Sequence, residues 1–406
     1  MKRATLHSVA GGSGYGELRP LVGPFLRPIV RVSGPEELLA EAGQGLPEGA
    51  ARPEAVAVRL RRAGVELGWG EPDTGLSQSA FLRLCRARGA SSVELVRADP
   101  TLLTELQLGA YFHAYWRRRV LRKAACAVRL SPRLLPGVAL AADIAFWRGV
   151  RSTATQHEWH RLTRSSYVVF YYHGVAEDRI GWEQLHASPR RVERQLRLLG
   201  RLGFRALSPD ELLAFHADPG ATLPARSFVV CADDGFRTAV DALRRHGHLR
   251  PQIFVNTSAV GGTGTWAGDE PLADWEELGA FAQDGGVVAS HCRTHPRLPD
   301  LDDGGLRDEI EGSLRELRER LPGAPPLFAY PYGLHDERVR SAVGAAGYDL
   351  AFTTEPGRNG AGIDPYCLRR LGLKDWDGTT PLLWLAITGE LLPWAWERRR
   401  RRRTRR

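Results

Sequence analysis

Residues 228–236, Phe-Val-Val-Cys-Ala-Asp-Asp-Gly-Phe, constrain the fold of this chain more than any other stretch. A short apolar run stops at two adjacent carboxylates and a glycine, which is typical of a buried strand that delivers acidic groups to the end of a sheet. Neighbouring side chains on a strand point to opposite sides, so one of Asp233 and Asp234 could hold a cation while the other handles a proton. Asp-Gly is also a common turn pair, and a plain turn is the alternative for this stretch taken alone.

Strand-like and helix-like segments alternate between residues 165 and 375, which predicts an α/β domain. The strand candidates are 167–172, 204–207, 228–232, 252–256, 287–290, 327–330, 350–353 and 368–373. About seven or eight strand–helix units suit a barrel of parallel strands better than an open sheet. In such barrels the catalytic groups come from the C-terminal ends of the strands.

Reactive side chains follow three of these strand candidates. Asp233 and Asp234 follow the strand candidate 228–232, and His291 and His295 follow 287–290. Pro331-Tyr332-Gly333 follows 327–330. Histidines four residues apart lie on one face of a helical turn and can share a metal ion. One carboxylate and two imidazoles leave coordination positions open, as in a catalytic metal site.

These residues resemble the polysaccharide deacetylases of carbohydrate esterase family 4, which include chitooligosaccharide and peptidoglycan deacetylases. The motifs that carry the resemblance are Tyr172-His173-Gly174-Val175, Ala232-Asp233-Asp234-Gly235-Phe236, Ser290-His291 with His295, Phe328-Ala329-Tyr330-Pro331-Tyr332-Gly333 and Leu368-Arg369-Arg370-Leu371. They cover about residues 167–375. The resemblance implies a distorted (β/α)7 barrel, with one strand fewer than the eight-stranded form.

The resemblance also implies an activity and a site. Asp234, His291 and His295 would hold a divalent metal ion, with zinc expected, and Asp233 would be the general base. The backbone N–H of Tyr332 would stabilise the oxyanion. The implied reaction is the hydrolytic removal of N-acetyl groups from amino sugars of a glycan or its lipid-linked precursor, releasing acetate and a free amine.

Two departures from the family pattern affect the expected site. Many members have an arginine that supports the base just before the Pro-Tyr-Gly turn, where this chain has Ala329-Tyr330. Many also have a late histidine that acts as the general acid, and no histidine follows His335. The acid could instead be His173 or His335, although His173 could also be a satisfied core residue. Trp376 could line the sugar site or simply pack in the core.

Three alternatives to sugar deacetylation remain open at this point. The same barrel could hydrolyse a non-sugar amide. The missing arginine and late histidine could mean a binding protein whose catalytic site has lapsed. Nucleic-acid binding is the third, but the formal charge of +9 is concentrated in residues 398–406, whose eight arginines leave about +1 for the rest of the chain. We therefore expect no nucleic-acid partner.

The regions on either side of the expected domain, 165–375, give weaker signals. Residues 1–105 are unassigned, with short helices expected at 35–42 and 79–88, and residues 106–160 form an aromatic and basic helical connector, so we expect a mostly helical N-terminal extension. The connector could be an ordinary packed amphipathic helix or a helix lying in an anionic membrane surface. Residues 380–406 combine an apolar helix with a polyarginine tail, which favours peripheral membrane contact or a disordered solubilising tail.

Cysteine usage and the N-terminal sequence predict the compartment. The five cysteines are scattered and contain no Cys-x-x-Cys pair, so neither a disulfide framework nor a zinc-thiolate site is indicated. The basic N-terminus is not followed by an apolar stretch long enough for a signal peptide. We expect a cytoplasmic bacterial protein that contacts the inner face of the membrane through its tail.

Overall fold

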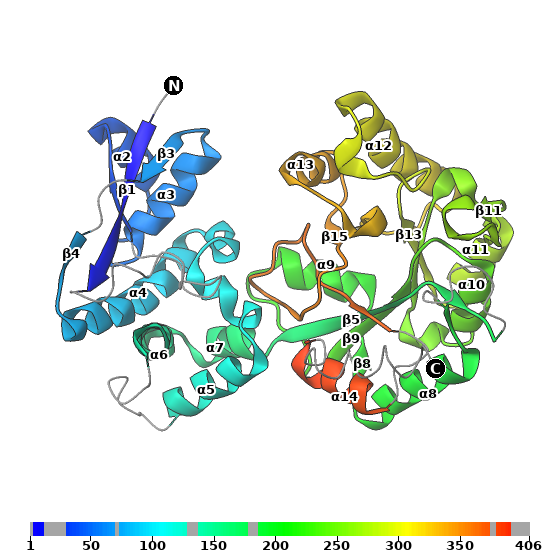
Figure 1. The fold of residues 1–406 in the computed structure, drawn as a ribbon, viewed down its shortest axis with the longest axis horizontal. Coiled ribbons are helices and arrows are strands. Elements are labelled where there is room, and N and C mark those ends of the chain that lie inside the picture. The colour runs from blue at the N-terminus through cyan, green and yellow to red at the C-terminus, as the bar shows by residue number, and fades with distance from the viewer. Residues whose placement is uncertain are drawn as a thin grey trace, which may run out of the picture. The chain divides into compact units, whose positions relative to one another are not determined.

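The computed structural model describes residues 3–11, 30–69, 73–127, 137–177, 186–373 and 379–390. The chain divides into two compact units. The first comprises Met1–Ser165 with Gly360–Ile363, and the second comprises Ser166–Asn359 with Asp364–Arg406. In Figure 1 most of the first unit is blue to cyan and most of the second is green to red.

The first unit contains a small sheet that the sequence did not predict. Strand β1 (Arg3–Gly11) runs antiparallel to β2 (Val30–Ser33) and parallel to β3 (Glu66–Trp69) and β4 (Asp73–Leu76). Three of these strands have only four residues, and although β2 (Val-Arg-Val-Ser) alternates between apolar and polar side chains, β3 and β4 do not. Such short strands carry too little periodicity to be recognised from one sequence.

Helices make up most of the rest of the first unit. They are α2 (Glu36–Gly43), α3 (Arg52–Arg62), α4 (Gln78–Ala98), α5 (Trp116–Ala127), α6 (Val138–Thr153) and α7 (Gln156–Thr163), with 3-10 turns η1 (Pro100–Thr104) and η2 (Gln107–His113). The side chain of Ser77 caps α4 by accepting from the Ala80 N–H. Helices α4 and α6 touch at Gly89 and Gly149, where an added Cβ would lie 1.9 Å from the Phe146 and Arg86 carbonyl oxygens respectively.

Several aromatic and basic residues of the connector pack inside the first unit, whereas Tyr115 is exposed. Arg122 is 1% exposed and forms a two-pronged ion pair with Asp143 at 2.8 Å. Arg118 binds the same carboxylate at 2.9 Å. The Arg122 guanidinium also lies 5.5 Å and 5.1 Å from the ring centres of Tyr111 and Trp147. Arg118 and Arg122 are thus bound to an internal carboxylate and need no lipid phosphate as a partner. This supports the interpretation of the connector as a packed amphipathic helix.

A mostly parallel sheet forms the centre of the second unit. Its order is β15-β14-β13-β10-β9-β5-β16, with β17 paired to β5 and β8 paired to β9. The strands are β5 (Ser166–Tyr172), β8 (Arg205–Ala206), β9 (Ser227–Ala232), β10 (Gln252–Val255), β13 (Val287–Ser290), β14 (Leu327–Ala329), β15 (Leu350–Phe352), β16 (Asn359–Gly360) and β17 (Leu371–Gly372). The pairs from β5 through β9, β10, β13 and β14 to β15 are all parallel. The predicted α/β class is confirmed.

The segment 368–372 connects β15, at one end of this sheet, with β5 near the other. Leu368 forms a parallel bridge with Phe352 at the end of β15, and β17 pairs in parallel with β5. Hydrogen bonds therefore lead from β15 through this segment to β5. The sheet is curled, and the carboxyl ends of its parallel strands meet at one edge (Figure 1).

Helices cover the outside of the curled sheet. They are α8 (Pro189–Arg201), α9 (Pro209–Ala217), α10 (Arg237–Arg244), α11 (Trp275–Gln283), α12 (Asp303–Arg320), α13 (Glu337–Ala345) and α14 (Thr379–Thr388). Capping boxes start α9 at Ser208 and α11 at Asp274. One face of α12 is buried at Leu306, Ile310 and Leu314.

The apolar helix near the C-terminus packs on the second unit. Leu382, Leu385 and Ala386 of α14 are buried in the main hydrophobic core of this unit. Leu391, Leu392, Trp394, Trp396 and the arginine tail lie outside the described residues. Among the residues that are described, no helix has both the length and the apolar character needed to span a membrane.

Candidate active site

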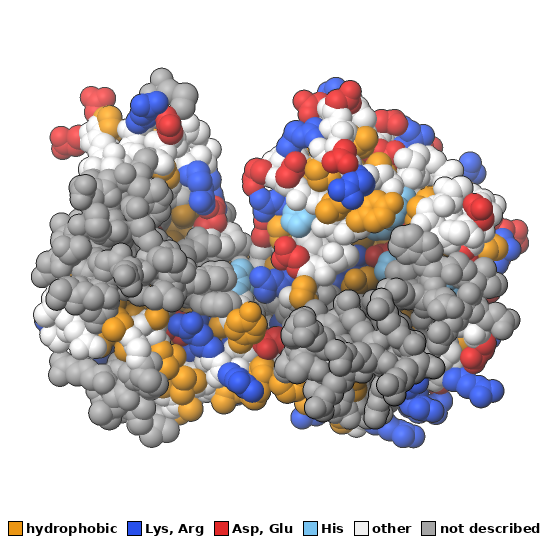
Figure 2. All heavy atoms as spheres, in the orientation of Figure 1, with side chains coloured by type: hydrophobic (Ala, Val, Ile, Leu, Met, Phe, Trp, Pro, Cys, Tyr) orange, Lys and Arg blue, Asp and Glu red, His pale blue; other side chains and the backbone are white. Residues whose placement is uncertain are grey.

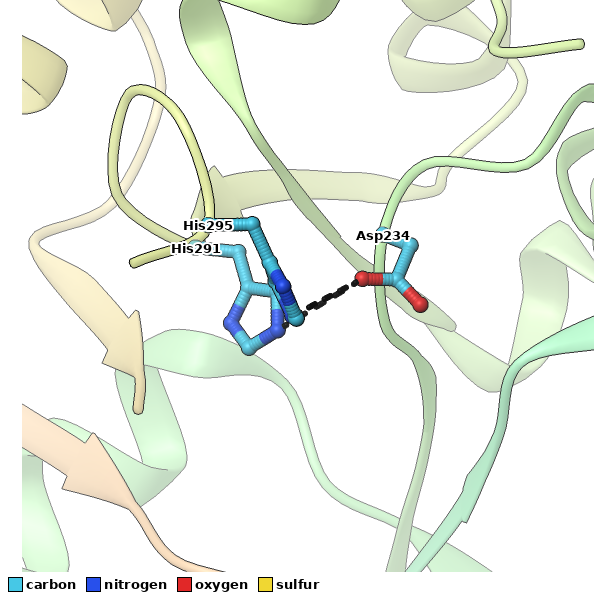
Figure 3. Close-up of side chains that lie close together, drawn as sticks. All are labelled: Asp234, His291 and His295. Atoms are coloured by element: carbon cyan, nitrogen blue, oxygen red, sulfur yellow. Dashed lines mark ion pairs between the residues drawn. The ribbon is translucent and has the colours of Figure 1, made fainter. Parts of the chain in front are cut away.

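The structure brings together the three residues predicted to hold a metal ion. Asp234 follows β9, while His291 and His295 follow β13. One ligand atom from each side chain lies within 4.8 Å of the others, and all three residues are buried. Figure 3 shows the two imidazole rings side by side and directed toward the Asp234 carboxylate. In Figure 2, histidine and acidic side chains are visible between hydrophobic ones on the face of the second unit.

The distances within this cluster fit a small divalent cation. Asp234 Oδ1 lies 3.3 Å from Nε2 of His295 and 3.8 Å from Nε2 of His291. Bonds of about 2.0–2.2 Å in a tetrahedral zinc site place neighbouring ligand atoms about 3.4 Å apart. His291 Nδ1 donates to the Ala329 carbonyl at 2.7 Å, so its Nε2 carries the lone pair that faces Asp234.

The electrostatics of the cluster also favour a cation. Burial, together with the negative charge of Asp233, raises the pKa of Asp234 to about 8. Burial, together with the neighbouring His291, lowers the pKa of His295 to about 2. The two imidazoles therefore bring no positive charge to the buried carboxylate, and a bound divalent cation would supply it. One carboxylate oxygen and two imidazole nitrogens are donors that zinc accepts.

Asp233 is held by an arginine whose role the sequence did not reveal. Arg370 donates from Nη1 to Asp233 Oδ1 at 2.6 Å and from Nη2 to Oδ2 at 2.8 Å, and neither side chain is more than 4% exposed. Burial alone would raise the pKa of Asp233, but the Arg370 guanidinium, together with His291 and His173, outweighs burial and lowers this pKa to about 2. Asp233 is therefore a carboxylate at neutral pH.

Arg370 binds Asp233 although the arginine expected just before the Pro-Tyr-Gly turn is missing. It belongs to the Leu368-Arg369-Arg370-Leu371 motif and reaches Asp233 from the segment that joins the sheet ends. Its Nε donates to the Thr353 carbonyl at 2.7 Å, which fixes the guanidinium. The absence of an arginine at 329–330 thus does not leave Asp233 without a guanidinium partner, and this argument for a lapsed site no longer holds.

The turn from His291 to His295 is fixed by groups beneath it. Glu309 of α12 accepts hydrogen bonds from the backbone N–H groups of Arg293 at 2.8 Å and Thr294 at 3.0 Å, and from the Thr294 hydroxyl. Ser290 Oγ accepts from the Cys292 N–H at 3.3 Å. These contacts hold the short loop that places both imidazoles on the same side.

Backbone strain is concentrated at this site. The non-glycine residues with positive φ include Asp234 (70°), Cys292 (69°), His295 (64°) and Tyr332 (58°). Residues in this conformation cost about 1–3 kcal/mol each and persist only where their surroundings enforce it. Gly333, the next residue, has φ 71°, and an added Cβ would lie 2.1 Å from Thr354 Oγ1. The turn at 331–333 is thereby fixed, with the Tyr332 ring centre 4.5 Å from that of His295.

The two candidate general acids differ in their surroundings. His173 follows β5, and its charge acts on the pKa of both Asp233 and His295, so it belongs to the electrostatic environment of the cluster. His335 stacks on Tyr330 with ring centres 4.9 Å apart, and its Nδ1 lies 3.1 Å from the Gly333 carbonyl oxygen. Trp376, the candidate for lining the sugar site, lies outside the described residues.

Replacing Arg370 by Met should expose its electrostatic role. The depressed pKa of Asp233 contributes stability above the pKa of an unfolded aspartate, about 3.9, and this contribution is lost as the pH falls toward 2. Arg370→Met leaves a buried carboxylate unpaired, so we expect a loss of about 3–5 kcal/mol in the free energy of unfolding at pH 7. Urea denaturation measures it, and because burial raises the pKa of the unpaired Asp233, the difference from the natural protein should shrink as the pH falls from neutral toward about 2.

Arg244→Met is the matched control for this prediction. Arg244 pairs with Asp284 in the same unit, but both side chains are nearly half exposed. We expect this change to cost less than about 1 kcal/mol. Equal losses for the two variants, or a loss for Arg370→Met that does not change with pH, would contradict the role given to the Arg370–Asp233 pair.

Comparison with known protein families and structures gives a consistent result. The family described as "Polysaccharide deacetylase" matches residues 220–351. The chain is also 22% identical over 206 residues to "Putative polysaccharide deacetylase YxkH" of Bacillus subtilis (strain 168), which covers 50% of this chain and 70% of YxkH.

Two solved structures are similar to the chain. The deacetylase PplD of Streptococcus pyogenes, in complex with acetate, is 20% identical and covers 56% of this chain and 100% of its own, with a TM-score of 0.48. IcaB from Ammonifex degensii is 23% identical and covers 55% of this chain and 97% of its own, with a TM-score of 0.47. The family match to residues 220–351 and the similarity to YxkH confirm the resemblance predicted from the motifs.

Proposed function

We propose that the second unit is a metal-dependent hydrolase that removes N-acetyl groups from amino sugars of a glycan or its lipid-linked precursor. The observation that carries this proposal is the pair of adjacent buried carboxylates with opposite pKa shifts. Asp233 is kept ionised by Arg370, while burial beside Asp233 raises the pKa of Asp234, which faces two imidazoles. A proton acceptor thus lies next to a set of cation ligands. The polysaccharide deacetylase domain supports an acetylated sugar as substrate.

Asp234, His291 and His295 would hold the ion, for which we propose zinc. When bound, a divalent ion lowers the pKa of a water molecule and polarises the acetamide carbonyl. Asp233 then accepts a proton from the attacking water. A carboxylate with a pKa of about 2 is a weak base, so Arg370 keeps Asp233 ionised and oriented at the expense of basicity. The water must therefore be acidified for Asp233 to act.

The turn at 331–333 supplies the remaining electrostatic element. We assign the backbone N–H of Tyr332 as the donor to the oxyanion that forms when water attacks the carbonyl carbon. Its position next to His295 and the enforced φ of 58° support a preorganised donor. Loss of one such donor typically costs about 100- to 1,000-fold in rate.

The hydrogen bonds through residues 368–372 support the finer architecture. We propose that β5, β9, β10, β13, β14, β15 and β17 form the distorted (β/α)7 barrel that the family resemblance implies. Its C-terminal edge would carry the site, since catalytic groups of such barrels follow the carboxyl ends of the strands.

We propose that His173 protonates the leaving amine. The action of its charge on Asp233 and His295 supports this assignment, whereas His335 contacts Tyr330, Gly333 and Cys367. Trp376 remains our candidate for the sugar-binding side chain.

Metal dependence and the role of Asp233 can be tested together. We expect a chelator to abolish acetate release from N-acetylglucosamine oligomers and zinc to restore it. Asp233→Asn should keep zinc binding, measured by isothermal titration calorimetry, but slow acetate release by about 100- to 10,000-fold. Linear and cyclic non-sugar amides are the comparison substrates. Faster turnover of those amides would identify an amidase, and an Asp233→Asn variant as active as the natural protein would contradict the proposed base.

The general acid can be identified from the dependence on the leaving group. An amine leaves as a neutral molecule only after gaining a proton, whereas nitrophenolate leaves without one. We therefore expect His173→Gln to slow acetate release from the N-acetyl sugar by about 100-fold or more, with little change for 4-nitrophenyl acetate. His335→Gln is the matched control and should leave both rates unchanged. The reverse pattern would assign the acid to His335.

We further propose a cytoplasmic location with contact to an anionic membrane through the C-terminal tail. Because Leu382, Leu385 and Ala386 of α14 are buried in the core, we propose that this contact depends on the arginines at 398–406. Each arginine at an anionic surface contributes up to about 1 kcal/mol.

Deleting residues 398–406 tests the membrane proposal. The truncated protein should lose cosedimentation with phosphatidylglycerol vesicles and keep its turnover of soluble oligomers. Vesicles of phosphatidylcholine alone are the control and should bind neither protein. Unchanged binding of the truncated protein to the anionic vesicles would contradict the proposal.

A further inference from the structure

Trp266 contacts the proposed metal ligands from a segment that lies outside the motifs shared with the deacetylase family. After β10 the chain forms a small hairpin, in which strands β11 (Thr263–Gly264) and β12 (Glu270–Pro271) pair antiparallel. The 3-10 turn η6 (Thr265–Ala267) lies between them and carries Trp266. We define residues 263–271 as the Trp266 hairpin.

The indole of Trp266 binds the carboxylate that is proposed to ligate the metal. Its Nε1–H donates to Asp234 Oδ1 at 3.1 Å. This is the same oxygen that faces Nε2 of His295 and Nε2 of His291. A carboxylate oxygen has two lone pairs, so the indole can occupy one and leave the other directed at the cation position. The hydrogen bond therefore fixes the rotation of the Asp234 carboxylate.

The same side chain fixes the ring of His295. The Trp266 and His295 rings stack with centres 4.8 Å apart and planes inclined by 15°, and the Tyr332 ring adds an edge contact at 4.5 Å. The Nδ1 atom of His295 is buried and has no hydrogen-bond partner among the described residues. His291 is oriented by a hydrogen bond to a carbonyl, whereas His295 is oriented by aromatic faces.

The Trp266 hairpin is anchored from below by a buried pair. Glu270 Oε2 lies 2.6 Å from His186 Nε2, and both side chains are at most 2% exposed. Thr238 of α10 donates to the other oxygen of Glu270 at 3.0 Å. The backbone N–H of Ala273, just after the hairpin, donates to the Gly235 carbonyl at 2.9 Å, next to Asp234 in sequence. Trp266 is therefore carried by a segment that is held in place on both sides.

From these contacts we infer that Trp266 is a positioning residue that sets the geometry of Asp234 and His295 for cation binding. This inference rests on the proposed function, because it assigns Trp266 a role at the same metal site. Side chains that orient metal ligands typically contribute about 10- to 100-fold to metal affinity. Trp266 combines two orienting contacts, one polar and one aromatic, on two different ligands.

The test measures zinc affinity of the full chain, which does not depend on turnover. Zinc is titrated against a competing chelator for the natural protein, Trp266→Phe and Trp266→Ala. Trp266→Phe removes the N–H and keeps a ring for His295, so we expect a loss of about 10-fold; Trp266→Ala removes both contacts, and we expect about 100-fold. Trp275→Phe is the matched control, since Trp275 packs against the core of the same unit, and it should bind zinc like the natural protein.

The outcomes separate this inference from the proposed function. If the natural protein binds no zinc, cobalt or nickel, the metal site itself is wrong. If it binds the ion and both Trp266 variants bind equally well, the metal site stands and the positioning role is wrong. Thermal unfolding of the zinc-free proteins tests whether a variant is simply destabilised. A positioning role predicts that Trp266→Phe and Trp275→Phe unfold at the same temperature, while only Trp266→Phe binds zinc more weakly.

Discussion

Two adjacent buried carboxylates at the end of β9 are the constraint on which this site depends. Burying one charge is costly, and burying two next to each other is more so unless each is balanced. The fold balances Asp233 with a two-pronged arginine and surrounds Asp234 with an indole N–H and two imidazoles. The same strand therefore delivers one carboxylate that an internal arginine keeps ionised and one whose pKa is raised beside two imidazoles. This difference is the basis of the separate roles that we propose, with Asp233 as the proton acceptor and Asp234 as a metal ligand.

The sequence predicted the second unit well because its signals are local. Apolar runs followed by Asp, His and Pro-Tyr-Gly located β9, β13 and β14, and parallel strand ends meet at one edge. It could not reveal Arg370 as the partner of Asp233, or Trp266 as a contact of Asp234. The first pairing joins residues 137 positions apart and the second joins residues 32 apart. Arg370 lay in a motif that was recognised, so its presence was visible while its partner was not.

The first unit was harder to predict, for a different physical reason. Strands β2, β3 and β4 have four residues each, too few for a periodic pattern, whereas α4 extends to Ala98, well beyond the helix expected at 79–88. Its contact with α6 depends on Gly89 and Gly149 meeting carbonyl groups, which single-sequence patterns do not encode. Arg118 and Arg122 of the connector bind Asp143, and the burial of Asp143 could not be predicted from the sequence.

The left-handed backbone at Asp234 and His295 limits how this site can vary. Asp, Asn and His tolerate positive φ better than most residues, whereas β-branched side chains are strongly disfavoured there. An exchange at position 234 or 295 therefore changes backbone energy as well as ligand chemistry. Asn at either position would keep the local conformation, while Val or Thr would distort the loop even if its charge or size were suitable. The ligand set is thus restricted by main-chain shape before any property of a bound ion is considered.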